Sequence, residues 1–530
     1  MKLLVSLLVL VPLSIVTLDD LQTDNRGAWQ TLAPMPTKRQ EVSTGVLNGK
    51  IYVIAGFDEN GASTSVVDVY DPVMNTWSSA APLPIATNHN AAAVAAGKLY
   101  AFGGTSNRCF TYNQPANTWS DVAAMKYQHG NTPAVAVIDD RIYVAGGDGP
   151  GMNQTEVEVY DPATNTWADL ARMNVPRNHT AGAVINGKFY VAGGRPGDTA
   201  ANALEVYDPK LNGWNILASM PTGRSGIGAA AINGELYVFG GEIPRIFGEV
   251  EVYNPLSNTW QQLAPMPTAK HGIFAAVIGS TVYIPGGAIM QGFGATNLNQ
   301  AYSVNTAATV SAASFTPTAI AGRSIVAGFG SGLATVTAIA GTLPLPTDLG
   351  GTTVEVLDRN GLRRLAPLFF VSSPQVNYQI PPGTAEGPAT IIVRGADGRV
   401  STGAFEIKAI APGLFTLSQN GTGAAAALDG FNFASAPFAA LGPGGVPNII
   451  AFFATGLGAD ATDLDANVSA SVQAMVGGTP AAVRYAGRAP GFTGLNQINV
   501  ALPAGIASGM HAVVIARGGI VSNSVTISIR

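Results

Sequence analysis

The residues best suited to chemistry in this chain are four histidines that recur in similar surroundings. Each lies eleven to fourteen residues before a tyrosine of a strand-like segment. Imidazole nitrogens bind transition metals, so the four side chains could form a metal site if the fold gathered them into a ring. Their unequal spacings argue against a regular ring, and we predict neither a metal nor a cofactor. The four are His89, His129, His179 and His271.

Basic residues occupy a neighbouring position of the same pattern. The chain has six such strand-like segments, each with a tyrosine. Four of the six residues that lie thirteen positions before these tyrosines are basic, namely Arg39, Arg177, Arg224 and Lys270. If their side chains reach one opening of the fold, they create a local positive potential that favours carboxylates or anionic sugars. The alternative is pairing with acidic residues of nearby loops, such as Asp148 or Glu242, or plain solvation.

The elements that must position these residues repeat along the first half of the chain. The six tryptophans of the chain follow one another at spacings of 48, 42, 48, 47 and 46 residues. So regular a period is typical of a repeat architecture. The tryptophans are Trp29, Trp77, Trp119, Trp167, Trp214 and Trp260.

Each repeat carries signals for four short strands. An Ala/Val segment such as 91–94 comes first, and a tight turn such as Asn48-Gly49 suits a hairpin. The second strand ends at a glycine doublet such as Gly103-Gly104, the third ends at Tyr-Asp-Pro as in residues 70–72, and the fourth carries the tryptophan. Four antiparallel strands at this period are typical of one propeller blade.

These doublets, Tyr-Asp-Pro turns and tryptophans resemble the kelch repeat. The resemblance covers residues 25–306 and implies an all-β fold with a six-bladed propeller. Because Trp29 precedes any first strand, its segment is predicted to supply the fourth strand of the last blade and so close the ring. In this family histidine is a common residue where His89 and His179 lie, and it serves the scaffold there.

The loops that follow the glycine doublets vary in length and content, as binding loops on a rigid frame do. Two of them carry apolar residues, including Phe247 and Phe293. We predict that these loops form a ligand-binding surface on one face of the ring, the loop face. The alternative is that the apolar residues pack on a neighbouring loop or domain. The predicted surface comprises Arg39, His89, Arg177, His179, Arg224, Lys270, Phe247 and Phe293.

The second half of the chain contains a different repeat. Residues 375–381 (QVNYQIP) match residues 497–503 (QINVALP), and each copy ends in a hairpin pattern. Two consecutive units with short strands, residues 309–408 and 409–530, predict two β-sandwiches. They resemble immunoglobulin-like modules of the transcription-factor-immunoglobulin type, in a tandem form that recurs in secreted bacterial proteins.

The N-terminus and the charge of the chain bound its location and partners. After Lys2 the chain is almost wholly apolar to Leu18, which predicts a signal peptide (residues 1–18) or an uncleaved anchor, with no other membrane span. The expected location is secreted, periplasmic or at the cell surface. A net charge of −5 without a long basic run excludes nucleic acid as a partner. The single cysteine, Cys109, excludes a disulfide within the chain and suits a core position.

These features favour a binding or adhesion protein whose propeller holds a glycan or a protein, with an anionic ligand as one expectation. The immunoglobulin-like pair would act as spacer or anchor. An enzyme stays open as the alternative. The basic residues fit a sialic-acid-mutarotase-like propeller loosely; a galactose-oxidase-like copper site would need a Tyr–Cys cross-link and two histidines, and we find no such set around Cys109.

Overall fold

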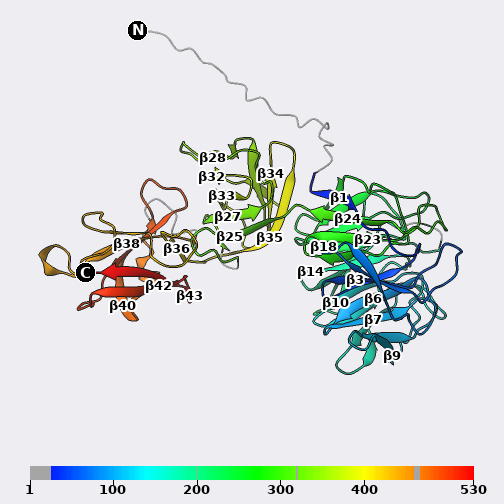
Figure 1. Cartoon of the computed structure of the whole chain (residues 1–530). Coiled ribbons are helices and arrows are strands. Elements are labelled where there is room, and N and C mark those ends of the chain that lie inside the picture. The colour runs from blue at the N-terminus through cyan, green and yellow to red at the C-terminus, as the bar shows by residue number, and fades with distance from the viewer. Residues whose placement is uncertain (1–24, 198, 200, 318–319, 459–465) are drawn as a thin grey trace, which may run out of the picture.

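The computed structural model describes residues 25–530 except 198, 200, 318–319 and 459–465. The predicted signal segment, residues 1–18, lies outside the described residues. The described chain is all β, with short 3-10 turns at Pro443–Gly445 and Ser469–Ser471. Three parts follow one another along the molecule, with the N-terminal ring of sheets at one end (Figure 1). No helix among the described residues is long and apolar enough to cross a bilayer.

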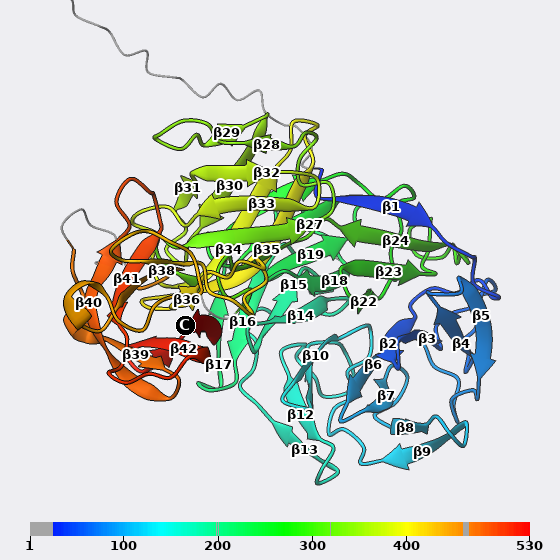
Figure 2. The same ribbon diagram turned by 60° about the vertical axis from the view of Figure 1, so that its left-hand side comes forward.

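Six four-stranded antiparallel sheets make up the N-terminal part (Figure 2). Sheet 1 contains β2 (Ser43–Leu47), β3 (Lys50–Ile54), β4 (Val67–Asp71) and β5 (Thr76–Ala80). Sheet 2 contains β6 (Asn90–Ala95), β7 (Lys98–Gly103), β8 (Cys109–Asn113) and β9 (Thr118–Val122). Sheet 3 contains β10 (Ala134–Ile138), β11 (Arg141–Ala145), β12 (Val157–Asp161) and β13 (Thr166–Asp169).

The next two sheets repeat this order, and the last sheet departs from it. Sheet 4 contains β14 (Ala181–Ile185), β15 (Lys188–Ala192), β16 (Leu204–Asp208) and β17 (Gly213–Ile216). Sheet 5 contains β18 (Gly228–Ile232), β19 (Glu235–Phe239), β20 (Val250–Asn254) and β21 (Thr259–Leu263). Sheet 6 contains β22 (Ala276–Ile278), β23 (Thr281–Pro285), β24 (Asn299–Val304) and, from the start of the chain, β1 (Gly27–Thr31).

The N-terminal strand β1 completes sheet 6, as its sequence predicts. It pairs antiparallel with β24, and Trp29 stands opposite Tyr302. The Trp29 ring also packs edge-on against Phe239 of sheet 5, with ring centroids 5.9 Å apart. The first strands of the six sheets contact one another in one closed cycle, β2–β6–β10–β14–β18–β22–β2. The last sheet is thereby joined to the first, and the ring is closed.

One set of side chains repeats at the junctions between sheets. Asn75 lies in the turn before Trp77, and its Oδ1 accepts hydrogen bonds from the Tyr70 hydroxyl and from the N–H of Ala33 in sheet 6. The Trp77 indole N–H donates to the carbonyl oxygen of the same Ala33, at 2.8 Å. Each such junction therefore binds both the N–H and the carbonyl oxygen of one alanine that follows the fourth strand of the preceding sheet. The same contacts recur at Ala81–Asn117–Trp119, Ala123–Asn165–Trp167, Ala171–Asn212–Trp214 and Ala218–Asn258–Trp260.

Residues 307–408 form a second β unit with two sheets around an apolar core. The first sheet has the order β25 (Ala307–Ser311), β27 (Ile325–Gly330), β33 (Gln375–Gln379), β32 (Leu368–Val371), β28 (Ala338–Ile339). The second has the order β26 (Ile320–Ala321), β35 (Val400–Lys408), β34 (Gly387–Arg394), β30 (Thr352–Leu357), β29 (Asp348–Leu349), and β31 (Arg363–Leu365) pairs with β30.

Residues 413–529 form a third unit around its own core. Its path is β36 (Gly413–Leu414), β38 (Ile449–Thr455), β41 (Asn496–Ala501), β40 (Thr479–Arg488), β39 (Val472–Val476), β42 (Gly509–Arg517), β43 (Ile520–Val521). The strands β37 (Ala427–Asp429) and β44 (Val525–Ile529) pair with β38 and β42. The sequence repeat maps onto equivalent pairs, because β33 pairs with β27 as β41 pairs with β38.

The second unit contacts the ring of sheets directly. Asn25 forms a parallel bridge with Arg399, and the Asn233 side chain donates to the carbonyl oxygen of Thr402 at 2.8 Å. Leu256, from the turn after β20, packs against a buried cluster of the second unit, namely Leu357, Ile392 and Val400. The contact combines backbone pairing with apolar burial at the side of the ring where sheets 5 and 6 lie.

Candidate functional site on the ring axis

A belt of backbone hydrogen bonds joins the six sheets just before their first strands. Each N–H donates to the carbonyl of the equivalent residue in the preceding sheet, with a one-residue step in sheet 3. The belt closes on itself, so it fixes the main chain around the axis. Its bonds run from His89 N to Glu41 O, Thr132 N to His89 O, His179 N to Asn131 O, Gly226 N to His179 O, Gly272 N to Gly226 O, and Glu41 N to Gly272 O.

The belt residues adopt the left-handed backbone conformation. The φ angles are 50° at Glu41, 49° at His89 and 51° at His179, where a side chain costs roughly 1–2 kcal/mol. Glycine avoids this cost at the equivalent positions Gly226 and Gly272. A Cβ on Gly272 would lie only 2.5 Å from Oε1 of Glu41, so this glycine leaves room for the carboxylate. Strain of this kind concentrates at functional sites.

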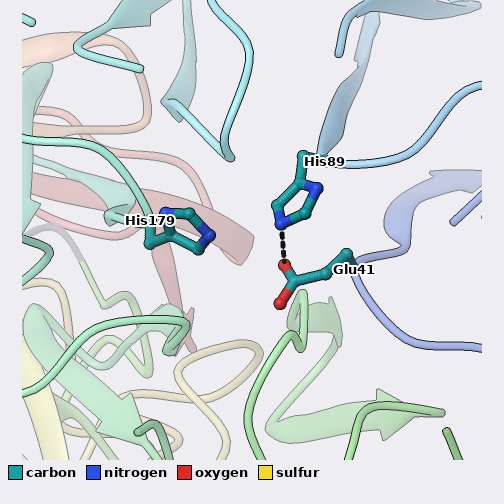
Figure 3. A group of neighbouring side chains, drawn as sticks. All are labelled: Glu41, His89 and His179. Atoms are coloured by element: carbon teal, nitrogen blue, oxygen red, sulfur yellow. Dashed lines mark ion pairs between the residues drawn. The ribbon is translucent and has the colours of Figure 1, made fainter. Parts of the chain in front are cut away.

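Three of the belt side chains point toward one another across the axis (Figure 3). They are Glu41 ahead of β2, His89 ahead of β6 and His179 ahead of β14, and their nearest nitrogen and oxygen atoms all lie within 4.8 Å of one another. Glu41 is buried, and its Oε2 lies 3.5 Å from Nε2 of His89. The Thr132 hydroxyl donates to Oε2 at 3.3 Å, and Nδ1 of His271 lies 3.5 Å from Oε1.

Hydrogen bonds assign the tautomers of both imidazoles. Nδ1 of His89 lies 2.5 Å from Oδ1 of Asn88, and Nδ1 of His179 lies 2.6 Å from Oδ1 of Asn178. An amide oxygen only accepts, so each Nδ1 carries the proton, and Nε2 of the neutral ring is left with its lone pair. The Asn88 amide is fixed in this sense because its Nδ2 donates to Ser63.

Electrostatics keep the carboxylate charged and these two imidazoles neutral. Burial would raise the pKa of Glu41, but the opposing contacts, among them that with His271, outweigh burial and hold that pKa well below its usual range. Burial, with the nearby Arg195, lowers the pKa of His89 and lowers that of His179 to about 3. The pKa of His271 is raised, because its contact with Glu41 outweighs burial.

An ion-pair network surrounds the three residues. The Arg195 guanidinium donates to Glu242 at 2.9 Å, and its other nitrogen lies 3.2 Å from Nε2 of His179. Glu242 accepts the N–H of Gly292 at 3.1 Å, and His271 Nε2 contacts the carbonyl of Met290 at 2.9 Å. The loop between β23 and β24 is thereby tied to the axis.

The four basic residues of the predicted surface lie inside the sheets, not at an open mouth. Arg39, Arg177, Arg224 and Lys270 have no exposed surface. Arg177 donates to Glu205 at 2.8 Å and to the carbonyl oxygens of Gly193 and Ala203. The acids that pair with the arginines lie in the third strand of each sheet, two residues before the tyrosine that precedes the turn to the fourth strand. They do not come from the loops that follow the glycine doublets. The equivalent pairs are Arg39–Asp68 and Arg224–Glu251.

The four histidines separate into three groups. His89 and His179 meet on the axis, and His271 stands beside them. His129 is buried in sheet 3, where it contacts Glu158 at 3.1 Å and the carbonyl of Gly146 at 2.6 Å, and so takes the place that arginine holds in sheets 1, 4 and 5. Cys109 is also buried, as predicted, and burial raises the pKa of its thiol to about 12.

The two predicted phenylalanines differ in exposure. Phe247 is buried beneath the Arg245 guanidinium, which lies 4.2 Å from the ring centroid. Phe293 is 56% exposed, next to exposed Ile289 and Met290. Its ring lies 5.3 Å from that of Phe57, which in turn meets the His89 ring edge-on at 5.4 Å. An exposed apolar patch, Ile289–Met290–Phe293, therefore borders the axis cluster.

Two hollows differ in character. A polar hollow of about 320 Å³ opens beside His89 and is lined by Asn88, Gln128, Asn131 and Asp148 among others. A larger apolar groove of about 1270 Å³ lies between the second and third units, and Phe369 and Phe492 are among its lining residues. Only the first hollow adjoins the belt residues.

The predicted surface did not include Glu41 or Arg195, and Glu242 was expected only as a loop acid that could pair with the basic residues. Glu41 lies eleven residues before Tyr52, the same spacing as His89 and His179 from their tyrosines. Comparing that position in all six repeats, without restricting it to histidines, would have found it. Arg195 and Glu242 directly follow the glycine doublets at 193–194 and 240–241.

Sheet 6 lacks the carboxylate that sheets 1, 4 and 5 place beside their buried cation. Gln300 stands opposite Ile284 in the register that Glu205 holds opposite Val191. Lys270 Nζ donates to the carbonyl of Ile284 at 2.8 Å, and its burial lowers its pKa to about 7. The Gln300 side-chain oxygen is buried without a hydrogen-bond partner among the described residues.

Restoring this carboxylate with Gln300→Glu is expected to stabilise the ring at neutral pH. In the wild-type chain the unfolded lysine, with a pKa of about 10.4, binds more protons than the folded one between about pH 7 and pH 10. Wild-type stability therefore gains from this group as pH rises through that window, and the burial penalty is fully present below about pH 7. Urea unfolding across the window measures both effects. The gain should disappear in Gln300→Glu and in the control Lys270→Met; equal pH profiles in all three proteins would contradict the assignment.

The ring of four-stranded sheets around one axis defines the N-terminal part as a β-propeller. Comparison with known families shows that the chain belongs to the kelch-repeat proteins: the KLHDC2/KLHL20/DRC7 Kelch-repeats domain matches residues 13–176, 133–287 and 178–327. The predicted kelch resemblance is confirmed.

Individual relatives match shorter stretches. The chain is 30% identical to Kelch-like protein 35 of Mus musculus over 139 residues, 26% of this chain and 24% of that protein. It is 40% identical to Kelch-like protein 31 of Homo sapiens over 80 residues, 14% of this chain and 12% of that protein. It thus spans a quarter or less of the length of these relatives. Among solved structures, that of YjhT aligns at 16% identity with a TM-score of 0.45, over 51% of this chain and 95% of that one.

Proposed function

We propose that the chain is a secreted or cell-surface binding protein that holds a protein ligand on the loop face of a six-bladed propeller. Kelch-repeat membership supports protein binding. The observation that carries the proposal is the exposed patch Ile289–Met290–Phe293, which lies on a loop tied to the rigid belt through Glu242 and His271. Apolar side chains held at the surface of a rigid frame suit a protein interface.

The rest of the chain fits a spacer or anchor. The proposed domains are the propeller over residues 25–306 and two immunoglobulin-like sandwiches over residues 309–408 and 409–530. The two cores and the equivalent strand pairs of the copies support this division. Export by the segment 1–18 is part of the same proposal, and mass measurement of the chain recovered outside the cell would test it.

Arrays of purified extracellular proteins and of glycans, probed with the full chain, test the proposed binding. Met290→Asp and Phe293→Ser are expected to lower protein binding at least tenfold, because both remove apolar area from the patch. Val73→Ser is the matched control, since Val73 is also exposed but lies in a turn between third and fourth strands. Binding confined to glycans, or equal losses in all three variants, would overturn the proposed ligand class or surface.

A further inference from the structure

We propose that Glu41, His89 and His179 form a binding site for one divalent transition-metal ion, zinc foremost, on the propeller axis (Figure 3). The three residues come from three different sheets, and the backbone belt holds all three main chains in place. A metal ion there would link sheets 1, 2 and 4 across the axis. Its three ligands are not residues of the protein-binding patch proposed above.

The hydrogen bonds around the site leave donor atoms that a cation would satisfy. Nε2 of His89 and Oε2 of Glu41 face each other at 3.5 Å, which is too long for a good hydrogen bond. Because Nδ1 of His89 carries the ring proton and donates it to Asn88, both facing atoms are acceptors. The Nε2 atom of His179 likewise has a lone pair for a metal, because its Nδ1 carries the ring proton and donates it to Asn178. A metal ion between these atoms would replace the contact of two acceptors by one bond each to Glu41, His89 and His179.

The supporting residues match the pattern of metal sites. Metal-bound histidines usually donate the other ring N–H to an oxygen that fixes the ring, and Asn88 and Asn178 do this for His89 and His179. The carboxylate is oriented by the Thr132 hydroxyl. Gly272 provides the space that Glu41 occupies. The site therefore has its supporting contacts without the metal.

The donor set selects the kind of metal. Two imidazole nitrogens and one carboxylate suit zinc and its neighbours, whereas magnesium and calcium prefer all-oxygen sites. Bonds of about 2.0–2.1 Å place donors about 3.3 Å apart around a tetrahedral ion, so the side chains must close from their present separation. The partly exposed His89 borders the polar hollow, from which a water molecule would supply the fourth ligand.

Arg195 competes with the metal for one donor. Its guanidinium lies 3.2 Å from Nε2 of His179 and must turn toward Glu242, which it already contacts. Arg195→Gln is therefore expected to tighten metal binding, an effect in the opposite direction to that of removing a ligand. A purely structural role for the cluster would not produce this opposite pair of effects.

The test uses the full chain freed of metal by a chelator and titrated with Zn²⁺ in a calorimeter, with metal content measured after dialysis. We expect one zinc per chain. Glu41→Gln, His89→Ala and His179→Ala should each weaken binding on the order of 100-fold, and Asn88→Ala about tenfold or more. His511→Ala, at a partly exposed histidine of the third unit, is the control and should leave binding unchanged.

Two further readouts keep the test decisive. Co²⁺ should give the visible absorbance of a low-symmetry, four-coordinate site in the wild-type chain and lose it in His89→Ala. Circular dichroism identifies any variant that fails to fold, in which case Arg195→Gln and Asn88→Ala decide the question. Absence of stoichiometric zinc, or zinc binding that only His511→Ala removes, would overturn the proposal.

Discussion

Deleting residues 27–34, which contain β1, is expected to abolish the cooperative unfolding transition of the propeller. The deletion exposes the edge of β24 and removes Trp29 from its contacts with Phe239 and Tyr302. It also removes Ala33, whose N–H and carbonyl oxygen are bound by Asn75 and Trp77 of sheet 1. Both the closing strand and one junction are therefore lost, and the ring opens at sheet 6.

Scanning calorimetry of the full chain measures this effect, because the propeller transition should vanish while the transitions of the C-terminal units persist. A synthetic peptide of residues 25–36 added to the deleted protein is the control and should restore a cooperative transition. A melting profile that the deletion leaves unchanged would contradict the closure of the ring by β1.

Glu205→Ala is expected to destabilise the propeller by about 3–5 kcal/mol, because it leaves the Arg177 guanidinium buried without its counter-ion. Both side chains of this pair are fully buried, and Nη2 of Arg177 lies 2.8 Å from Oε2 of Glu205. Glu205 also accepts the N–H groups of Asn174 and Val175, which hold the chain ahead of sheet 4. The substitution therefore removes a charge partner and two backbone contacts together.

Urea unfolding followed by circular dichroism measures the loss. The double variant Arg177→Met/Glu205→Leu should recover much of it, since an apolar pair replaces the ionic one without leaving a lone charge. Asp121→Ala, which removes the partner of Arg108 in an exposed pair, should change the midpoint little. Equal effects of Glu205→Ala and Asp121→Ala would refute the role assigned to the buried pair.

The spacing of residues predicted the ring because five of the six junctions need the same contacts. Asn75 and Trp77 bind the N–H and the carbonyl oxygen of Ala33, and Tyr70 holds Asn75, so each of these repeats must keep the three residues at fixed distances. Such local and periodic constraints are visible in a single sequence. The pairing of β1 with β24 followed from the same count, since Trp29 had no first strand before it.

The direction of a side chain was harder to predict than its position. The spacing placed Arg177 correctly ahead of a first strand, yet its side chain enters the sheet because Glu205 and strand carbonyls satisfy it there. Phe247 and Phe293 both lie in loops after glycine doublets, yet Phe247 is buried beneath Arg245 and Phe293 is exposed. These outcomes depend on contacts between distant segments, which periodicity does not record.

The confinement of all six indoles to the propeller has a spectroscopic consequence. Fluorescence excited selectively at tryptophan arises from the ring alone, since no tryptophan follows Trp260 in the chain. Five of the six indole N–H groups donate to a carbonyl of the adjacent sheet, so their emission should shift to longer wavelength as soon as neighbouring blades separate. The native chain thus carries a built-in optical probe that distinguishes opening of the ring from melting of the two units behind it.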